Sequence, residues 1–116
     1  MSHVTFETAA RLKEAGFPQP KPSFGQFWWF AHPETMWTRI VIVGTADFSL
    51  VEDKMRHCSI SPALEDITAL LPSVFTLEMR EGRHSCNIDT WQNLVQTQAD
   101  NFAEAAALAW LALNTP

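Results

Sequence analysis

The spacing of apolar positions changes along the chain and predicts helices that alternate with hairpins. Residues 5–15 (TFETAARLKEA) carry apolar side chains at helical spacing. Thr5 suits the N-cap of this first helix. Gly16 is expected to end it in a left-handed conformation, with Phe17 packing back against Leu12. Alternating prolines then predict an extended connection, at Pro18, Pro20 and Pro22.

Two runs rich in aromatic and β-branched residues follow, FGQFWWFA at 24–31 and MWTRIVIV at 36–43. The HPET sequence between them contains Pro33, which suits a turn, so the pattern predicts a hairpin. Residues 44–59 have weak periodicity and are predicted to be a loop with room for a short strand.

A second helix is predicted to begin at Ser61, because serine caps well and Pro62 needs no hydrogen-bond partner at the first helical position. Pro72 is expected to end it. The predicted buried stripe consists of Leu64, Ile67, Leu70 and Leu71.

The next two apolar runs, VFTLEMR at 74–80 and HSCNIDTW at 84–91, flank Glu81-Gly82 and predict a second hairpin. A weaker strand is predicted in NLVQTQA at 93–99. The pairing that this turn implies sets Met79 against His84, Leu77 against Cys86 and Phe75 against Ile88.

The last predicted helix begins at Asn101, with Glu104 three residues later in a capping-box arrangement. It continues to residue 114 and is nearly apolar all round. Such a helix lies at the centre of a fold or is covered on a second side by another subunit. Together the elements predict a two-layer α+β fold in which antiparallel β-hairpins pack on three helices. The whole chain, 1–116, is expected to form a single domain.

Composition narrows the classes of function. The formal net charge of −5 opposes nonspecific binding to nucleic acid. The longest apolar stretch, 105–113, is about half of a membrane span, so no membrane association is expected. Two cysteines are too few for a disulfide framework, and no leader-like segment opens the chain, so a cytoplasmic location is predicted. The four glycines form neither a P-loop nor a dinucleotide fingerprint, and we expect no cofactor.

Three stretches resemble a family of small uncharacterised proteins from bacterial and phage genomes. They are LKEAGFPQP at 12–20, SPALEDITALLP at 61–72 and EAAALAWLALN at 104–114. All three lie in segments predicted to be structural, and the resemblance implies neither an activity nor a functional residue. It implies a context, that of an accessory protein of a phage or another mobile element.

His57, Cys58, His84 and Cys86 are the candidates for metal binding or nucleophilic catalysis. Neighbouring strand residues point to opposite faces, so His57 and Cys58 do not suit one ion, whereas His84 and Cys86 share a face. The predicted pairing places His84 and Cys86 on the apolar face of the second hairpin, which favours packing. We therefore expect no metal site, and a small metal-dependent or cysteine enzyme is kept as the alternative.

The first hairpin is the predicted place of function. A turn centred on Pro33-Glu34 sets Phe30 against Trp37 and Trp28 against Arg39. Phe27 and Trp29 then lie on the core face, while the opposite face is also mostly apolar and needs a cover. The cover is the chain itself, a second subunit, or a ligand held between aromatic side chains and an arginine.

The sequence thus predicts a non-enzymatic binding protein whose aromatic hairpin face contacts a partner. The expected contact residues are Gln26, Trp28, Phe30, Trp37 and Arg39. The expected partners are a further copy of the chain in a homo-oligomer, a host protein, or a small, nucleotide-like ligand. A purely structural oligomer subunit is the third reading.

Overall fold

The computed structural model describes residues 4–20, 26–31, 37–41, 58–72, 74–89 and 94–114. This part contains helices α1 (Phe6–Glu14), α3 (Leu64–Thr68) and α4 (Phe102–Asn114). Its strands form two antiparallel sheets, in the orders β2-β1-β3 and β4-β5-β6. The strands are β1 (Phe27–Ala31), β2 (Trp37–Val41), β3 (Cys58–Ser61), β4 (Phe75–Arg80), β5 (Arg83–Asp89) and β6 (Leu94–Ala99). The predicted α+β class, with antiparallel hairpins and three helices, is confirmed. The strands form two sheets, however, and not the one sheet of the predicted two-layer arrangement.

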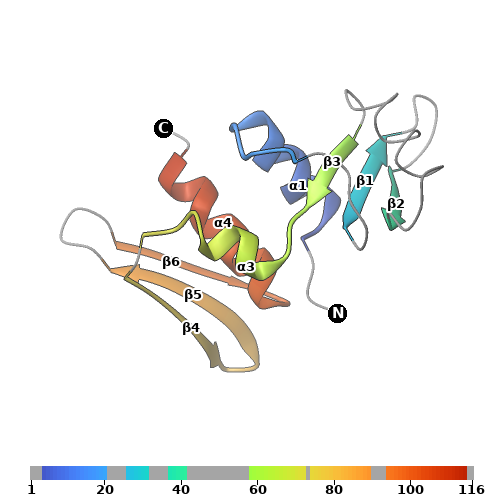
Figure 1. Cartoon of the computed structure of the whole chain (residues 1–116). Coiled ribbons are helices and arrows are strands. Elements are labelled where there is room, and N and C mark those ends of the chain that lie inside the picture. The colour runs from blue at the N-terminus through green and yellow to red at the C-terminus, as the bar shows by residue number, and fades with distance from the viewer. Residues whose placement is uncertain are drawn as a thin grey trace.

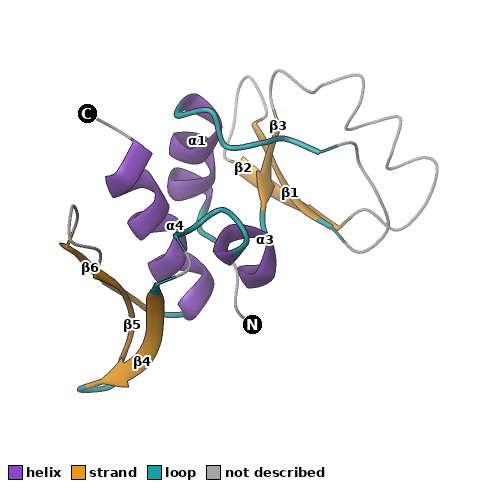
Figure 2. Ribbon diagram, turned by 60° about the vertical axis from the view of Figure 1, so that its left-hand side comes forward, coloured by secondary structure: helices purple, strands orange, loops and turns teal. Residues whose placement is uncertain are grey.

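The helices lie between the two sheets (Figures 1 and 2). Helix α4 packs on β5 and β6 on one side and contacts α1 and α3 on others, while α1 contacts β3. Buried residues run around α4 with hardly a break from residue 103 to residue 111. The prediction that this helix is central is confirmed. No helix of the described ranges is long and apolar enough to cross a membrane.

Helix α1 begins and ends as the sequence predicts. The hydroxyl of Thr5 accepts a hydrogen bond from the backbone N–H of Thr8. At the other end Gly16 has φ 96°, and the N–H of Phe17 donates to the carbonyl of Leu12 at 2.8 Å. A second bond, from the N–H of Gly16 to the carbonyl of Lys13, completes a Schellman motif.

Helix α3 begins later than predicted, because Ser61 belongs to strand β3 and pairs with Phe27. The hydroxyl of Ser61 accepts a hydrogen bond from the backbone N–H of Val4 at 3.2 Å and donates to the carbonyl of Val4 at 3.3 Å. The N-cap is Ala63, whose N–H donates to the carboxylate of Asp66. Ser61 therefore fastens the N-terminal segment to β3 rather than capping the helix.

The capping box predicted for α4 is only half present. The side chain of Asn101 accepts from the N–H of Glu104 at 2.8 Å, as expected. The carboxylate of Glu104 does not return to Asn101 but crosses to α1. There it accepts from the N–H of Thr5 at 2.8 Å and from the hydroxyl of Thr8. Glu104 is buried, so this carboxylate joins the first turns of two helices inside the protein.

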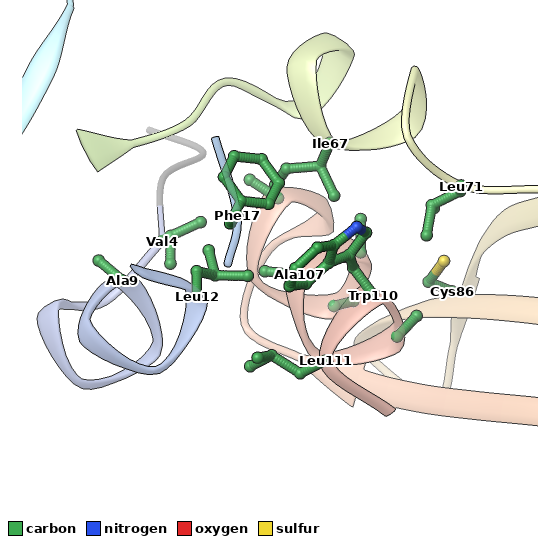
Figure 3. Packing of buried hydrophobic residues seen from close by; sticks show 14 of the residues in the cluster. Val4, Ala9, Leu12, Phe17, Ile67, Leu71, Cys86, Ala107, Trp110 and Leu111 are labelled. Atoms are coloured by element: carbon green, nitrogen blue, oxygen red, sulfur yellow. The ribbon is translucent and has the colours of Figure 1, made fainter. Parts of the chain in front are cut away.

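The apolar core forms where the three helices meet strand β5 (Figure 3). The ring of Phe17 meets that of Trp110 edge to face, with centroids 5.1 Å apart. Thr97 of β6 ties the sheet to the central helix, because its hydroxyl donates to the carbonyl of Ala105 at 2.6 Å. The labelled core residues are Val4, Ala9, Leu12, Phe17, Ile67, Leu71, Cys86, Ala107, Trp110 and Leu111.

Candidate functional site

The pairing of β1 with β2 differs by one residue from the predicted register. Trp29, not Trp28, lies across from position 39, and Phe30 lies across from position 38. A slip of one residue exchanges the two faces of a strand. Positions 37 and 39 therefore share the face of Trp29, and the predicted cluster of Trp28 with Trp37 and Arg39 is wrong in this respect. The last pair before the loop, Ala31 with Trp37, encloses five residues where the prediction had four.

Trp28 is a core residue. Its exposed fraction is 0%, the lowest of the tryptophans described. The indole N–H donates to the side-chain oxygen of Gln26 at 3.0 Å, so Gln26, a second predicted contact residue, is held by Trp28. Across the sheet Trp28 faces Ile60, which is also buried. Since a single chain removes all of this surface from water, the chain itself covers Trp28.

Trp29 lies on the opposite face, where the N-terminal segment covers it. Its indole N–H donates to the carbonyl of Val4 at 3.0 Å, and its ring lies 6.0 Å from that of Phe6. The neighbouring positions on this face of β3, Ser59 and Ser61, are buried as well. Both faces of β1 are therefore covered, which explains why the strand is apolar on two sides.

The other predicted contact residues, Phe30, Trp37 and Arg39, are placed by their backbone alone. Phe30 follows the parity of Trp28, whereas positions 37 and 39 follow that of Trp29. The side chains of these three residues lie outside what the structure describes, and their contact with a partner stays a prediction. The sequence predicts residues 44–59 to be a loop with room for a short strand. Positions 44–57 lie outside the described residues, and the last two belong to strand β3.

The second hairpin has the predicted register, with His84 opposite Met79 and Cys86 opposite Leu77. Both candidates lie on the face that α4 covers. Cys86 is fully buried, and burial raises the pKa of its thiol, which keeps it in the unreactive neutral form. The ring of His84 meets that of Phe102 edge to face at 4.6 Å, and its buried Nδ1 has no hydrogen-bond partner.

This arrangement gives a nucleophile or metal site little support. His57 and the side chain of Cys58 lie outside the described part of the chain. Within that part, no three His, Cys, Asp or Glu side chains are grouped to hold a metal ion. His84 and Cys86 lie two positions apart on one strand, which is not a geometry in which an imidazole activates a thiol.

Cys86 is expected to resist thiol reagents in the native protein. In a Cys58→Ser variant, which leaves one cysteine, Ellman's reagent should react only as fast as the protein opens, because the thiol is buried and neutral at neutral pH. The measurement is the absorbance change with and without denaturant. A rapid native reaction would show an accessible thiolate and would reopen the reading of Cys86 as a nucleophile.

The sheet β4-β5-β6 has two different faces. Its inner face, towards α4, consists of Phe75, Leu77, Met79, His84, Cys86, Ile88, Val95, Thr97 and Ala99. Its outer face consists of Thr76, Glu78, Arg80, Arg83, Ser85, Asn87, Asp89, Leu94, Gln96 and Gln98. This polar face was missed as a site in the sequence, although its signal is plain: polar residues at every second position of three successive strands.

A row of side chains on the outer face is fixed by internal hydrogen bonds. The carboxylate of Glu78 forms an ion pair with the guanidinium of Arg80 at 3.0 Å. It also accepts a hydrogen bond from the side-chain amide of Asn87 at 3.0 Å. Ser85 approaches Asn87 at 3.5 Å and donates to the carbonyl of Thr97 at 3.2 Å. On either side of this row, Thr76, Gln96 and Gln98 are exposed. No described helix packs on the outer face (Figure 1).

A shallow hollow lies where α1 meets α4 in the described part of the chain. It is lined by Arg11, Glu14, Ala15 and Leu111. It is open to solvent and offers only two oppositely charged side chains from one helix, which is little for a small-molecule site.

Comparison with known proteins adds no relative: no family model matches the chain, and no curated protein or solved structure is significantly similar to it.

Proposed function

We propose that this protein is a non-enzymatic accessory protein that binds a partner protein through the outer face of sheet β4-β5-β6. The observation that carries the proposal is the row Arg80, Glu78 and Asn87 on a sheet face that no described helix covers. Ser85, which is buried, supports Asn87 from within the sheet. Side chains that are already ordered lose little conformational entropy when a partner docks on them.

The chemistry of the outer face suits a protein partner better than a small ligand. The face offers neutral donors and acceptors at Thr76, Gln96 and Gln98. It also carries two arginines, Arg80 and Arg83, and the carboxylates of Glu78 and Asp89. Leu94 is 72% exposed and adds an apolar contact at one end. A polar, hydrogen-bonding surface with a limited apolar area is typical of interfaces between proteins that also exist apart.

The nucleotide-binding version of the hypothesis has less support than the protein-binding version. It used Trp28 as one wall of a pocket, and that side chain is buried with Gln26 as its hydrogen-bond partner. Because three stretches of the sequence resemble small bacterial and phage proteins, we propose a host protein as the partner. Homo-oligomers are compatible with this role, because they would present more than one outer face.

Site-specific photo-cross-linking tests the proposal. A photoreactive amino acid in place of Gln98 is expected to give discrete adducts in cells that naturally carry the gene, and mass spectrometry identifies the partner. The matched control is the same substitution at Glu65, an exposed residue of α3 that lies outside the sheet. With the purified partner, Gln98→Arg should weaken binding by about tenfold or more, because it places a new charge in the contact.

Adducts of equal pattern from positions 98 and 65 would show nonspecific contact and contradict the proposal. So would the absence of any adduct at 98, or an affinity that Gln98→Arg leaves unchanged.

A further inference from the structure

Strand β4 forms an open edge of its sheet in the described structure. Helix α4 packs mainly over β5 and β6. On β4, Phe75 and Leu77 are partly buried against the core, whereas Met79 is 56% exposed. β4 contains no proline and no bulge, two devices that protect exposed edges from pairing, and its charged side chains, Glu78 and Arg80, both lie on the outer face.

The turn between β4 and β5 determines which backbone groups of β4 are free. Glu81 and Gly82 have φ 54° and 79°, as in a type I′ turn, and Arg80 faces Arg83 across it. The pair next to such a turn exchanges hydrogen bonds, and the direction of the backbone groups alternates along a strand. The N–H and C=O groups that point to the open edge are therefore those of Phe75, Leu77 and Met79.

We propose that β4 pairs with β4 of a second copy of this chain, antiparallel, about a twofold axis at Leu77. On the inner face, Phe75 then lies across from Met79 of the second copy, and the two Leu77 side chains meet on the axis. On the outer face, Thr76 lies across from Glu78 of the second copy. The result is a continuous six-stranded sheet in which the exposed Met79 gains an apolar neighbour.

The pattern of β4 is complementary to itself, which is why the occupant is a second copy. The paired inner faces are apolar throughout, and no like charges stand opposite each other on the outer faces. A twofold axis one residue further along would put two Glu78 carboxylates directly opposite, which disfavours that register. The hydrogen bonds of this dimer lie along the strand edge, so the contact does not depend on the partner binding proposed for the outer face.

Charge substitutions at Thr76 test both the dimer and its register. Sedimentation velocity over a concentration series should show the wild-type protein in equilibrium between one and two chain masses. Thr76→Glu should weaken the dimer and Thr76→Lys should strengthen it, because each change acts on Glu78 of the other copy. The axis makes the pair occur twice, so each shift should be roughly 2- to 30-fold in the dissociation constant.

Gln96 provides the matched control, because it is also exposed on the outer face but lies on the opposite edge strand, β6. Gln96→Glu and Gln96→Lys should leave the dissociation constant unchanged. A wild-type protein that stays monomeric throughout would overturn the inference. The inference would also be overturned if both Thr76 variants shifted the dissociation constant in the same direction. It would be overturned as well if the Gln96 variants shifted it as the Thr76 variants do.

A disulfide measurement keeps the inference testable if a Thr76 variant folds poorly. Hydrogen-bonded antiparallel pairs have Cα atoms about 5.5 Å apart, within the range of a disulfide. Cys86 lies directly opposite position 77 on β5 and would compete for the new thiol, so it is removed as well. In a Cys58→Ser, Cys86→Ala background, Leu77→Cys should therefore cross-link two chains under mild oxidation. Arg80→Cys should not cross-link the chains, because the two copies of position 80 lie several residues apart along the paired strands. Cross-linking of Arg80→Cys with none at Leu77→Cys would contradict the proposed axis.

Discussion

Trp28→Ala is expected to lower the free energy of unfolding by about 3–5 kcal/mol, the range for removing a large aromatic side chain from a core. The indole of Trp28 is completely buried, and its N–H is bonded to Gln26. The substitution leaves a cavity between β1 and what covers it, and the oxygen of Gln26 loses its donor. Urea unfolding followed by circular dichroism measures the change.

Two matched variants separate the causes of this effect. Trp28→Phe keeps most of the apolar volume and should cost about 1–2 kcal/mol, largely through the lost hydrogen bond and the smaller ring. Leu94→Ala, at a site that is 72% exposed, should change the stability by less than about 0.5 kcal/mol. A loss near zero for Trp28→Ala would mean that Trp28 does not pack in the core and would restore it as a candidate contact residue.

The two hairpins show when a strand register can be predicted from sequence. In β4-β5, Glu81-Gly82 is a two-residue turn whose geometry fixes the pairing, and all three predicted pairs are present. In β1-β2, Pro33 indicates a turn but does not fix the number of residues in the loop. One extra loop residue was enough to exchange the faces of Trp28 and Trp29.

The apolar pattern of β1 was informative even though its assignment to faces was wrong. Adjacent tryptophans on a strand require cover on both faces, and both are covered: Trp29 by Val4 and Phe6, and Trp28 by the same chain. The sequence could not show this, because the cover of Trp29 comes from a segment some 25 residues away. Local pattern identifies the need for burial, whereas the tertiary fold decides which partner supplies it.

The residues at the helix starts also show that a local pattern does not fix a distant partner. Thr5 and Asn101 cap their helices as predicted, because an N-cap needs only neighbours in sequence. Ser61 and Glu104 also have the right local pattern, yet both side chains take distant partners, Val4 and the first turn of α1. Where a long-range contact satisfies the same polar group inside the protein, it can replace the local one.

Glu104→Ala is accordingly expected to lower the free energy of unfolding by about 2–4 kcal/mol, more than the loss of an ordinary helix cap. The carboxylate is 8% exposed and serves the N–H of Thr5 and the hydroxyl of Thr8. Alanine would leave two donors without their partner between α4 and α1. Glu65→Ala, at an exposed site on α3, is the control and should change the stability by less than about 0.5 kcal/mol.

A double-mutant cycle of Glu104→Ala with Thr8→Val, measured by urea unfolding, isolates the contact between the helices. We expect a coupling energy of about 1–2 kcal/mol, because the second substitution removes a donor that the first has already deprived of its acceptor. Strictly additive losses would contradict this link, and Glu104 would then stabilise α4 only through its place in the first turn.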